Sequence, residues 1–376
     1  LKIAANKDDE FGELARSNLD QIQTTGVEEL LISLVDPRGT QETEGALDAA
    51  VIAQAIQAIG RRELTGAVPV LLENARVRKE DALKSESYDV LTKLARAEDA
   101  RTLLEMNFQI KSQRVRTRAD RALLAAIRKM EPAESQAAFL IEAIEPAPGS
   151  EARASILKLL GRLGGEQAFQ VLRKYVASDD ATIRDAAIRA LADFPSAEPI
   201  DELVAIARDG SADKVHRVLA LRGAARMLGR GLNRNHREMF ELARTVLSLA
   251  ETDDDRKLVI ANLAEVKQPG IIELIAPMLG VEALAVETSS TILKLAPHVW
   301  KYAPQETSRT LAAIAGDGLS DAQKEELRRI SEQMETLKTT VTGWQVAGPY
   351  TNPEARDRSS LLASRFAPET SGTEAV

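Results

Sequence analysis

Residues 178–194, with the sequence SDDATIRDAAIRALADF, carry the pattern that decides the fold. The large and small apolar side chains recur at helical spacing, which places them on one face of a helix. These residues are Ile183, Ala187, Leu191 and Phe194. Asp179 or Asp180 stands where an N-cap belongs, because a short acidic side chain can accept hydrogen bonds from the first free backbone N–H groups.

A second helix is expected directly after the first. Pro195 breaks the helical pattern, and Pro199 can occupy the first turn of a helix over residues 200–208. Residues 151–178 and 253–280 repeat this arrangement of two short amphipathic helices joined by a turn. The unit of the fold is therefore predicted to be an antiparallel helix pair.

The helix pair recurs along the chain with a period of about 33 residues, which is typical of helix-pair repeats. Eight apolar anchors mark it: Ile59, Leu94, Ile127, Leu160, Leu191, Leu228, Leu263 and Leu293. Alternating strand patterns are absent from this region. We therefore expect an all-α fold, a right-handed α-solenoid of about eight to nine antiparallel helix pairs over residues 1–338. An irregular tail is expected over residues 339–376.

The repeats resemble those of the HEAT family over about residues 10–335. The resemblance is carried by GSEARASILKLLGRLGGEQAFQVLRKYV (149–176) together with residues 178–194. Four successive repeats place an arginine at the matching position: Arg153, Arg184, Arg217 and Arg256. The resemblance implies a non-catalytic scaffold that binds a protein partner, or a neighbouring domain of the same polypeptide, through its solenoid surface. It does not identify that partner, since one fold serves many functions.

The C-terminal segment carries a different signal. VTGWQVAGPY (341–350), followed by Asn352-Pro353 and FAPE (366–369), resembles the opening of a β-rich module found in large secreted bacterial proteins that act on sugars. That resemblance implies a fragment of a multidomain, extracytoplasmic protein in which the solenoid is a structural arm and catalysis lies outside this chain. The other interpretation is a polar linker rich in Pro, Gly, Ser and Thr.

Composition excludes several kinds of function. The 376 residues include no Cys and three His, so cysteine-ligated metal centres and thiol catalysis are excluded and an imidazole metal site is not expected. The net charge of −8 and the scarcity of aromatic residues argue against sequence-specific nucleic-acid binding. No segment is apolar enough to span a membrane.

No catalytic or phosphate-binding motif is recognisable in the sequence, so we expect neither an enzyme nor a cofactor. A HEAT-like lyase acting on a small molecule is the remaining enzymatic alternative.

Two basic runs are the candidate binding sites, because arginine forks suit carboxylate and phosphate groups. The first holds Lys214, Arg217, Arg222, Arg226, Arg230, Arg234 and Arg237, and the second includes Arg114, Arg118 and Arg121. On a continuous helix the arginines from 222 to 234 would form one stripe, although Gly229 and Gly231 are expected to end the helix and move Arg234 and Arg237 into a turn. The alternative is that both runs pair with acidic residues of adjacent repeats or form a solvated helix face. His216 and His236 flank the first run and are expected to be structural.

Overall fold

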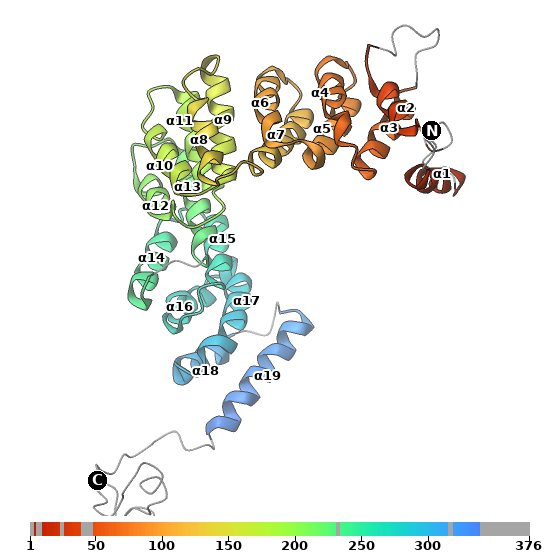
Figure 1. Cartoon of the computed structure of the whole chain (residues 1–376). Coiled ribbons are helices and arrows are strands. Elements are labelled where there is room, and N and C mark those ends of the chain that lie inside the picture. The colour runs from red at the N-terminus through yellow and green to blue at the C-terminus, as the bar shows by residue number, and fades with distance from the viewer. Residues whose placement is uncertain are drawn as a thin grey trace, which may run out of the picture. The chain divides into compact units, whose positions relative to one another are not determined.

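The computed structural model describes residue 4 and residues 10–22, 26–38, 48–230, 234–314 and 319–338. Over these residues the chain is all-α, with 19 α-helices and no strand (Figure 1). The helices are α1 Glu10–Gln21, α2 Val27–Val35, α3 Ala49–Arg61, α4 Val68–Val77, α5 Asp81–Leu94, α6 Ala100–Gln109, α7 Gln113–Ile127, α8 Glu134–Glu142, α9 Gly149–Leu163, α10 Glu166–Tyr175, α11 Ala181–Ala192, α12 Ile200–Arg208, α13 Lys214–Met227, α14 His236–Ser248, α15 Asp253–Leu263, α16 Pro269–Ile275, α17 Glu282–Val299, α18 Pro304–Ala312 and α19 Asp321–Lys338. Three short 3-10 helices, Thr65–Ala67, Ala97–Asp99 and Ala276–Gly280, join some of them. The predicted C-terminal module or linker, residues 339–376, lies outside the described residues.

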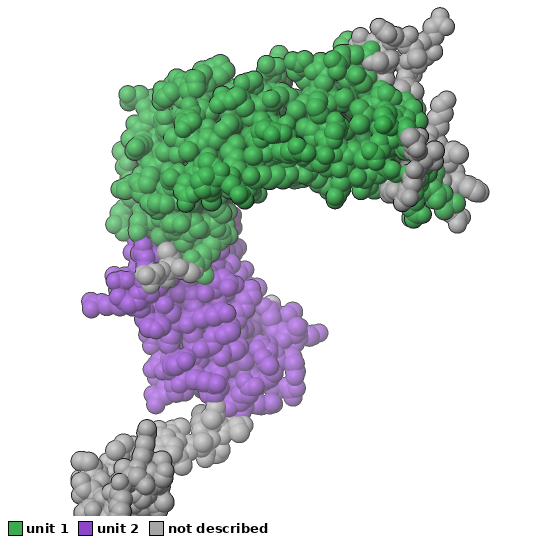
Figure 2. Space-filling model, in the orientation of Figure 1, with its two compact units in different colours: residues 1–232 green, residues 233–376 purple. Residues whose placement is uncertain are grey.

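The chain divides into two compact units, residues 1–232 and 233–376 (Figure 2). Within the first unit the odd-numbered helices from α1 to α13 pack one on the next, and the even-numbered helices lie against them. Within the second unit α15, α17 and α19 form the same kind of row, with α14, α16 and α18 beside it. This two-row stack confirms the predicted α-solenoid of helix pairs.

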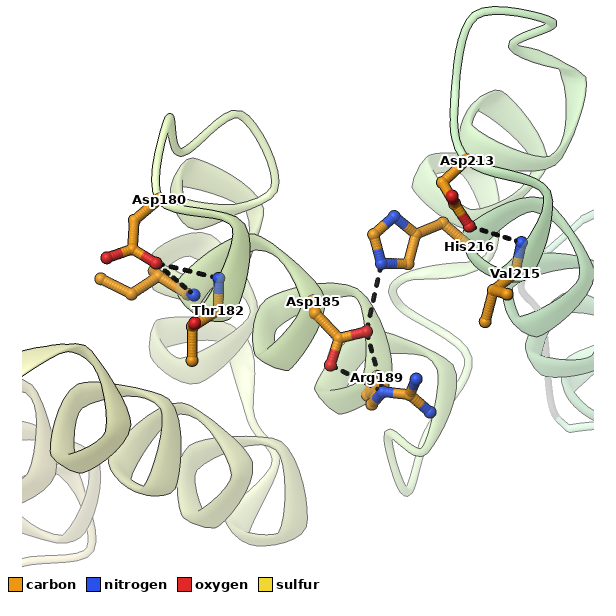
Figure 3. Close-up of polar contacts among 8 residues, drawn as sticks. Asp180, Thr182, Asp185, Arg189, Asp213, Val215 and His216 are labelled. Carbon is orange, nitrogen blue, oxygen red and sulfur yellow. Dashed lines mark hydrogen bonds and ion pairs between the residues drawn. The ribbon is translucent and has the colours of Figure 1, made fainter.

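Helix α11 begins and ends close to where the sequence pattern predicts. The side chain of Asp180 accepts hydrogen bonds from the backbone N–H groups of Thr182 at 2.9 Å and Ile183 at 3.2 Å, so Asp180 is the N-cap (Figure 3). The next helix, α12, covers the predicted residues 200–208. Pro199 is its N-cap residue instead of lying in its first turn.

The eight sequence anchors all lie on the odd-numbered helices or the residue that caps them, and each is at most 5% exposed. The predicted face of α11 is also buried, with Phe194 fully covered and packed edge-on against Phe169. The repeat therefore marks the row of helices that contributes most of the continuous core.

Glycine permits close approach between successive odd-numbered helices. A Cβ atom added to Gly161 of α9 would lie 2.7 Å from the Cβ atom of Ala190 on α11, and one added to Gly223 of α13 would lie 2.8 Å from the Cα atom of Ala192. Both glycines sit inside helices, where glycine costs about 1 kcal/mol relative to alanine. Glycine is present at these two positions despite this cost because a larger side chain would not fit between the helices.

Candidate functional site

The first basic run does not form one stripe. Helix α13 ends at Met227, so Arg222 and Arg226 lie one turn apart on the helix and Arg230 follows it. Arg234 belongs to the second unit, where it lies outside the helices. Arg237 lies on α14 and not in a turn as the sequence suggested.

Two of these arginines bind backbone carbonyls of the preceding repeat, one at the end of α11 and one in the turn that follows it. Arg226 donates a hydrogen bond to the carbonyl oxygen of Ala192, the last residue of α11, and its Nη1 atom lies 3.9 Å from the carboxylate of Asp193. Nη1 of Arg230 donates to the carbonyl oxygen of Pro195 at 2.9 Å. The last carbonyls of a helix have no partner within the helix and carry partial negative charge. Arg226 and Arg230 are therefore part of the junction between repeats.

A similar contact occurs three junctions earlier, between α5 and α7. There the Nζ atom of Lys129 donates to the carbonyl oxygens of Lys93 at 2.8 Å and Ala95 at 2.6 Å, at the end of α5. A basic residue at or just after the end of one odd-numbered helix thus binds backbone carbonyls at or just after the end of the preceding odd-numbered helix. The second basic run covers residues 111–129 and ends at Lys129, so contacts of this kind account for part of the positive charge in both runs.

The HEAT-position arginines are also structural where their contacts are defined. Arg153 donates to the carbonyl oxygen of Glu145 at 3.2 Å and Arg184 to that of Ser178 at 2.6 Å, so each folds back onto the segment before its own helix. Arg116 of α7 makes the equivalent contact. Sequence analysis did not assign Arg116 to the arginine position of the repeat, although its place as the fourth residue of the helix matches that of Arg184.

Arg256 departs from this pattern, because it pairs with Asp253 at 2.9 Å within the first turn of α15. Arg217 holds the corresponding place in α13 and is half-buried.

The second basic run also contains both arginines that join repeats and arginines that are exposed. Arg118 of α7 pairs with Asp89 of α5, which joins two adjacent repeats. Arg114 and Arg121 are exposed and make no hydrogen bond or ion pair with another described residue. Of the predicted residues on α7, these two are available to a partner.

Charge is distributed unevenly between the two rows of helices. The odd-numbered helices α7, α9, α11 and α13 contain thirteen Lys or Arg and three Asp or Glu. The even-numbered helices α6, α8, α10 and α12 contain four Lys or Arg and six Asp or Glu. Positive charge is thus concentrated on one row in a chain whose net charge is −8.

Six of the thirteen basic side chains are exposed, and we call this set the basic face. It consists of Arg114, Arg121, Lys158, Arg162, Lys214 and Arg222. An odd-numbered helix has odd-numbered neighbours on two sides and even-numbered helices behind it, so its exposed residues share the remaining outward side. Lys158 and Arg162 lie on α9 outside both basic runs, and their helical position is the signal that would have found them. Nη1 of Arg162 also donates to Oδ2 of Asp120 on α7 at 2.6 Å, so this arginine joins two adjacent repeats as well.

A polar cavity of about 680 Å³ lies between α11 and α13, and Figure 3 shows the contacts of Asp185, Arg189 and His216 among the residues that line it. At its wall, Nε2 of His216 lies 3.2 Å from Oδ1 of Asp185, and Nε of Arg189 donates to both oxygens of the same carboxylate at 2.9 and 2.8 Å. Burial favours a higher pKa for Asp185, but hydrogen bonds from Arg189 and His216 outweigh it and hold that pKa below its usual value.

The polar side chains of this cavity already have partners within it. Asp209 accepts hydrogen bonds from the backbone and hydroxyl of Ser211, and Asp213 caps α13 at the N–H group of Val215. These hydrogen bonds stabilise the junction between two repeats, and the contact of His216 with Asp185 is one of them. Over the residues that the structure describes, no three His, Asp or Glu side chains gather in a way that could hold a metal ion.

The stacked helix pairs define the chain as an α-solenoid. The sequence model for HEAT repeats matches residues 137–222, so this part of the solenoid consists of HEAT repeats. Comparison with curated proteins found no match. None of the described helices is long and apolar enough to cross a membrane.

Solved structures are similar in fold. One, from work on Kap95p binding to RanGDP, is 11% identical with a TM-score of 0.50 and covers 89% of this chain and 51% of the other. Kap121p is 12% identical with a TM-score of 0.38, and the match covers 91% of this chain and 47% of Kap121p. Human deoxyhypusine hydroxylase is 15% identical with a TM-score of 0.26, and the match covers 86% of this chain and 100% of the other. The chain thus spans about half the length of the karyopherin structures, and the likeness concerns the fold alone.

Proposed function

We propose that this protein is a non-catalytic scaffold that binds an acidic protein partner, or an acidic neighbouring domain of its own polypeptide, through the basic face. The supporting observation is the difference in charge between the two rows of helices over residues 100–227. Complementary charge steers association and selects partners. A row of parallel helices spaced about 10 Å apart presents that charge over an extended surface.

The chemistry of the basic face favours a polypeptide over a nucleic acid. Helices α7, α9, α11 and α13 contain no Phe, Trp or Tyr, so the face has no side chain on which a base can stack. Seven of their thirteen basic side chains are half-buried, and several hold repeat junctions together. Arg114, Arg121 and Lys158 of the basic face are exposed and make no such contact, and they suit carboxylates displayed along an extended or helical segment.

The test measures binding of a fluorescein-labelled ten-residue glutamate peptide to the full chain by fluorescence anisotropy at low ionic strength. The variant reverses three charges of the basic face: Arg114→Glu, Arg121→Glu and Lys158→Glu. Exposed ion pairs contribute about 0.2–1 kcal/mol each, so three reversals should weaken binding by about tenfold or more. Reversing Arg226 or Arg230 is avoided, because these residues bind carbonyls at a repeat junction.

A matched control reverses two exposed basic residues of the even-numbered helices, Lys174→Glu and Arg208→Glu. It should bind the glutamate peptide nearly as well as the unaltered protein. Equal losses in the control and in the triple variant would contradict a role for the basic face. Tighter binding of a single-stranded DNA of matched charge would point to a nucleic acid instead.

A further inference from the structure

An apolar groove lies between two even-numbered helices, α6 and α8. Its volume is about 660 Å³, within the range of about 300–1,000 Å³ common for binding pockets. Its walls are formed by Leu104, Phe108, Phe139, Ala143, Pro146, Ala147 and Pro148, with Arg101, Glu105, Gln109 and Glu142 at the rim. The groove is thus apolar inside and charged at its edge.

The groove contains half-buried aromatic side chains in a chain that has few of them. Phe108 and Phe139 remain half-buried on opposite walls. By contrast, Phe169 and Phe194 pack edge-on against each other, with ring centroids 6.3 Å apart. Partly exposed aromatic surface facing a concave space is the usual position of a binding anchor.

The rim of the groove is negative. Glu105 on α6 and Glu142 on α8 are exposed on opposite walls, and neither pairs with a basic group among the described residues. The last residues of both helices, Gln109 and Glu142, also line the groove, and helix C-termini carry partial negative charge. Arg101 is the one basic lining residue. The electrostatic environment therefore favours a cationic occupant.

We propose that this groove binds a short peptide segment of a partner protein, in which one or two bulky apolar residues are flanked on both sides by Lys or Arg. The apolar side chains fill the space between Phe108 and Phe139, and the flanking cations meet Glu105 and Glu142. The partner chemistry is opposite to that required by the basic face, and the groove lies on the other row of helices. The two surfaces are therefore separate sites, and this inference does not rest on the proposed function.

The test uses two fluorescein-labelled peptides that share a central Leu-Phe pair, one with two lysines on each side and one with two glutamates. Binding is measured by fluorescence anisotropy to the full chain carrying the basic-face substitutions Arg114→Glu, Arg121→Glu and Lys158→Glu, so that the glutamate peptide does not bind the basic face. The lysine peptide should bind about tenfold more tightly than the glutamate peptide, because two rim carboxylates attract one and repel the other. In the double variant Glu105→Lys, Glu142→Lys this preference should be reversed.

Two further variants locate the binding. Ala143→Phe adds bulk at the groove wall without removing packing, so it should abolish binding of the lysine peptide while circular dichroism shows an intact helical fold. Glu134→Lys changes an exposed glutamate at the other end of α8, outside the groove, and should leave binding nearly unchanged.

Unchanged binding of the lysine peptide to the Ala143→Phe variant would overturn the proposal. An equal loss of affinity in the Glu134→Lys variant and in the double variant Glu105→Lys, Glu142→Lys would also overturn it. Equal affinity for the two peptides would show that the rim does not select cations and would also overturn it. The triple variant of the basic face should bind the lysine peptide normally, so failure of this inference and failure of the proposed function are distinguishable.

Discussion

Replacing Gly161 by alanine should destabilise the protein, although alanine is the better helix former. Gly161 lies within α9, where it faces α11, and an added Cβ atom would lie 2.7 Å from Cβ, 2.9 Å from Cα and 2.9 Å from the carbonyl oxygen of Ala190. Carbon atoms pack most favourably at about 3.5–4.0 Å. The two helices must therefore separate locally by roughly 1 Å, because backbone atoms cannot rotate away as a side chain can.

Two opposing effects set the magnitude. Helix propensity favours alanine by about 1 kcal/mol, while overpacking a close-packed core costs about 1–3 kcal/mol. Since two of the three close contacts are to backbone atoms, we expect the upper part of that range and a net loss of about 1–2 kcal/mol in the free energy of unfolding. Separation at this junction also loosens the stacking of the neighbouring repeats.

The assay is urea denaturation followed by circular dichroism at 222 nm, comparing transition midpoints. Gly66→Ala is the matched control, because a Cβ atom added there meets nothing within 4 Å, and it should leave stability unchanged or slightly higher. Adding Ala190→Gly to Gly161→Ala removes one of the three contacts, so the pair should show a favourable coupling energy. An unaltered or raised midpoint for Gly161→Ala alone would refute the close-packing argument.

Three further predictions concern single side chains. Asn74 is fully buried and donates to the hydroxyl of Ser87 at 2.8 Å, so Asn74→Ala should lower the free energy of unfolding by about 1–3 kcal/mol in urea denaturation. The folded-state pKa of Asp185 is lowered, so its stabilising contribution is present above the ordinary value of 3.8 and is lost as the pH falls through the folded-state value. Asp185→Asn should therefore lower the melting temperature at pH 7, and the difference from the unaltered protein should shrink as the pH is lowered below 3.8. Arg226→Ala should lower the melting temperature more than Arg121→Ala, since only the first removes a bond to a helix-end carbonyl.

Much of the fold follows from periodicity in the sequence. The apolar face of α11 and the bounds of α12 were predictable, because an amphipathic helix needs apolar residues at fixed spacing and a cap at its start. The eight anchors located the odd-numbered helices for the same reason. The prediction that Arg237 lies in a turn was wrong, because glycines mark where one helix ends but not where the next begins.

The candidate site was predictable only in part. Sequence analysis located Arg114, Arg121, Lys214 and Arg222 of the basic face, since they fall in dense basic runs. It missed Lys158 and Arg162, which lie among neutral residues and join the face only because α9 stacks beside α7. It also could not separate Arg226, which binds a carbonyl of the preceding repeat, from its exposed neighbour Arg222.

The amino-acid sequence alone determined the repeating unit, since helical spacing and capping are local properties that act within a few residues. Tertiary structure decided which charges hold repeats together and which face solvent, because that depends on residues about one repeat apart being brought into contact. It also decided where apolar surface remains uncovered, as in the groove between α6 and α8, since burial depends on how closely neighbouring helices approach.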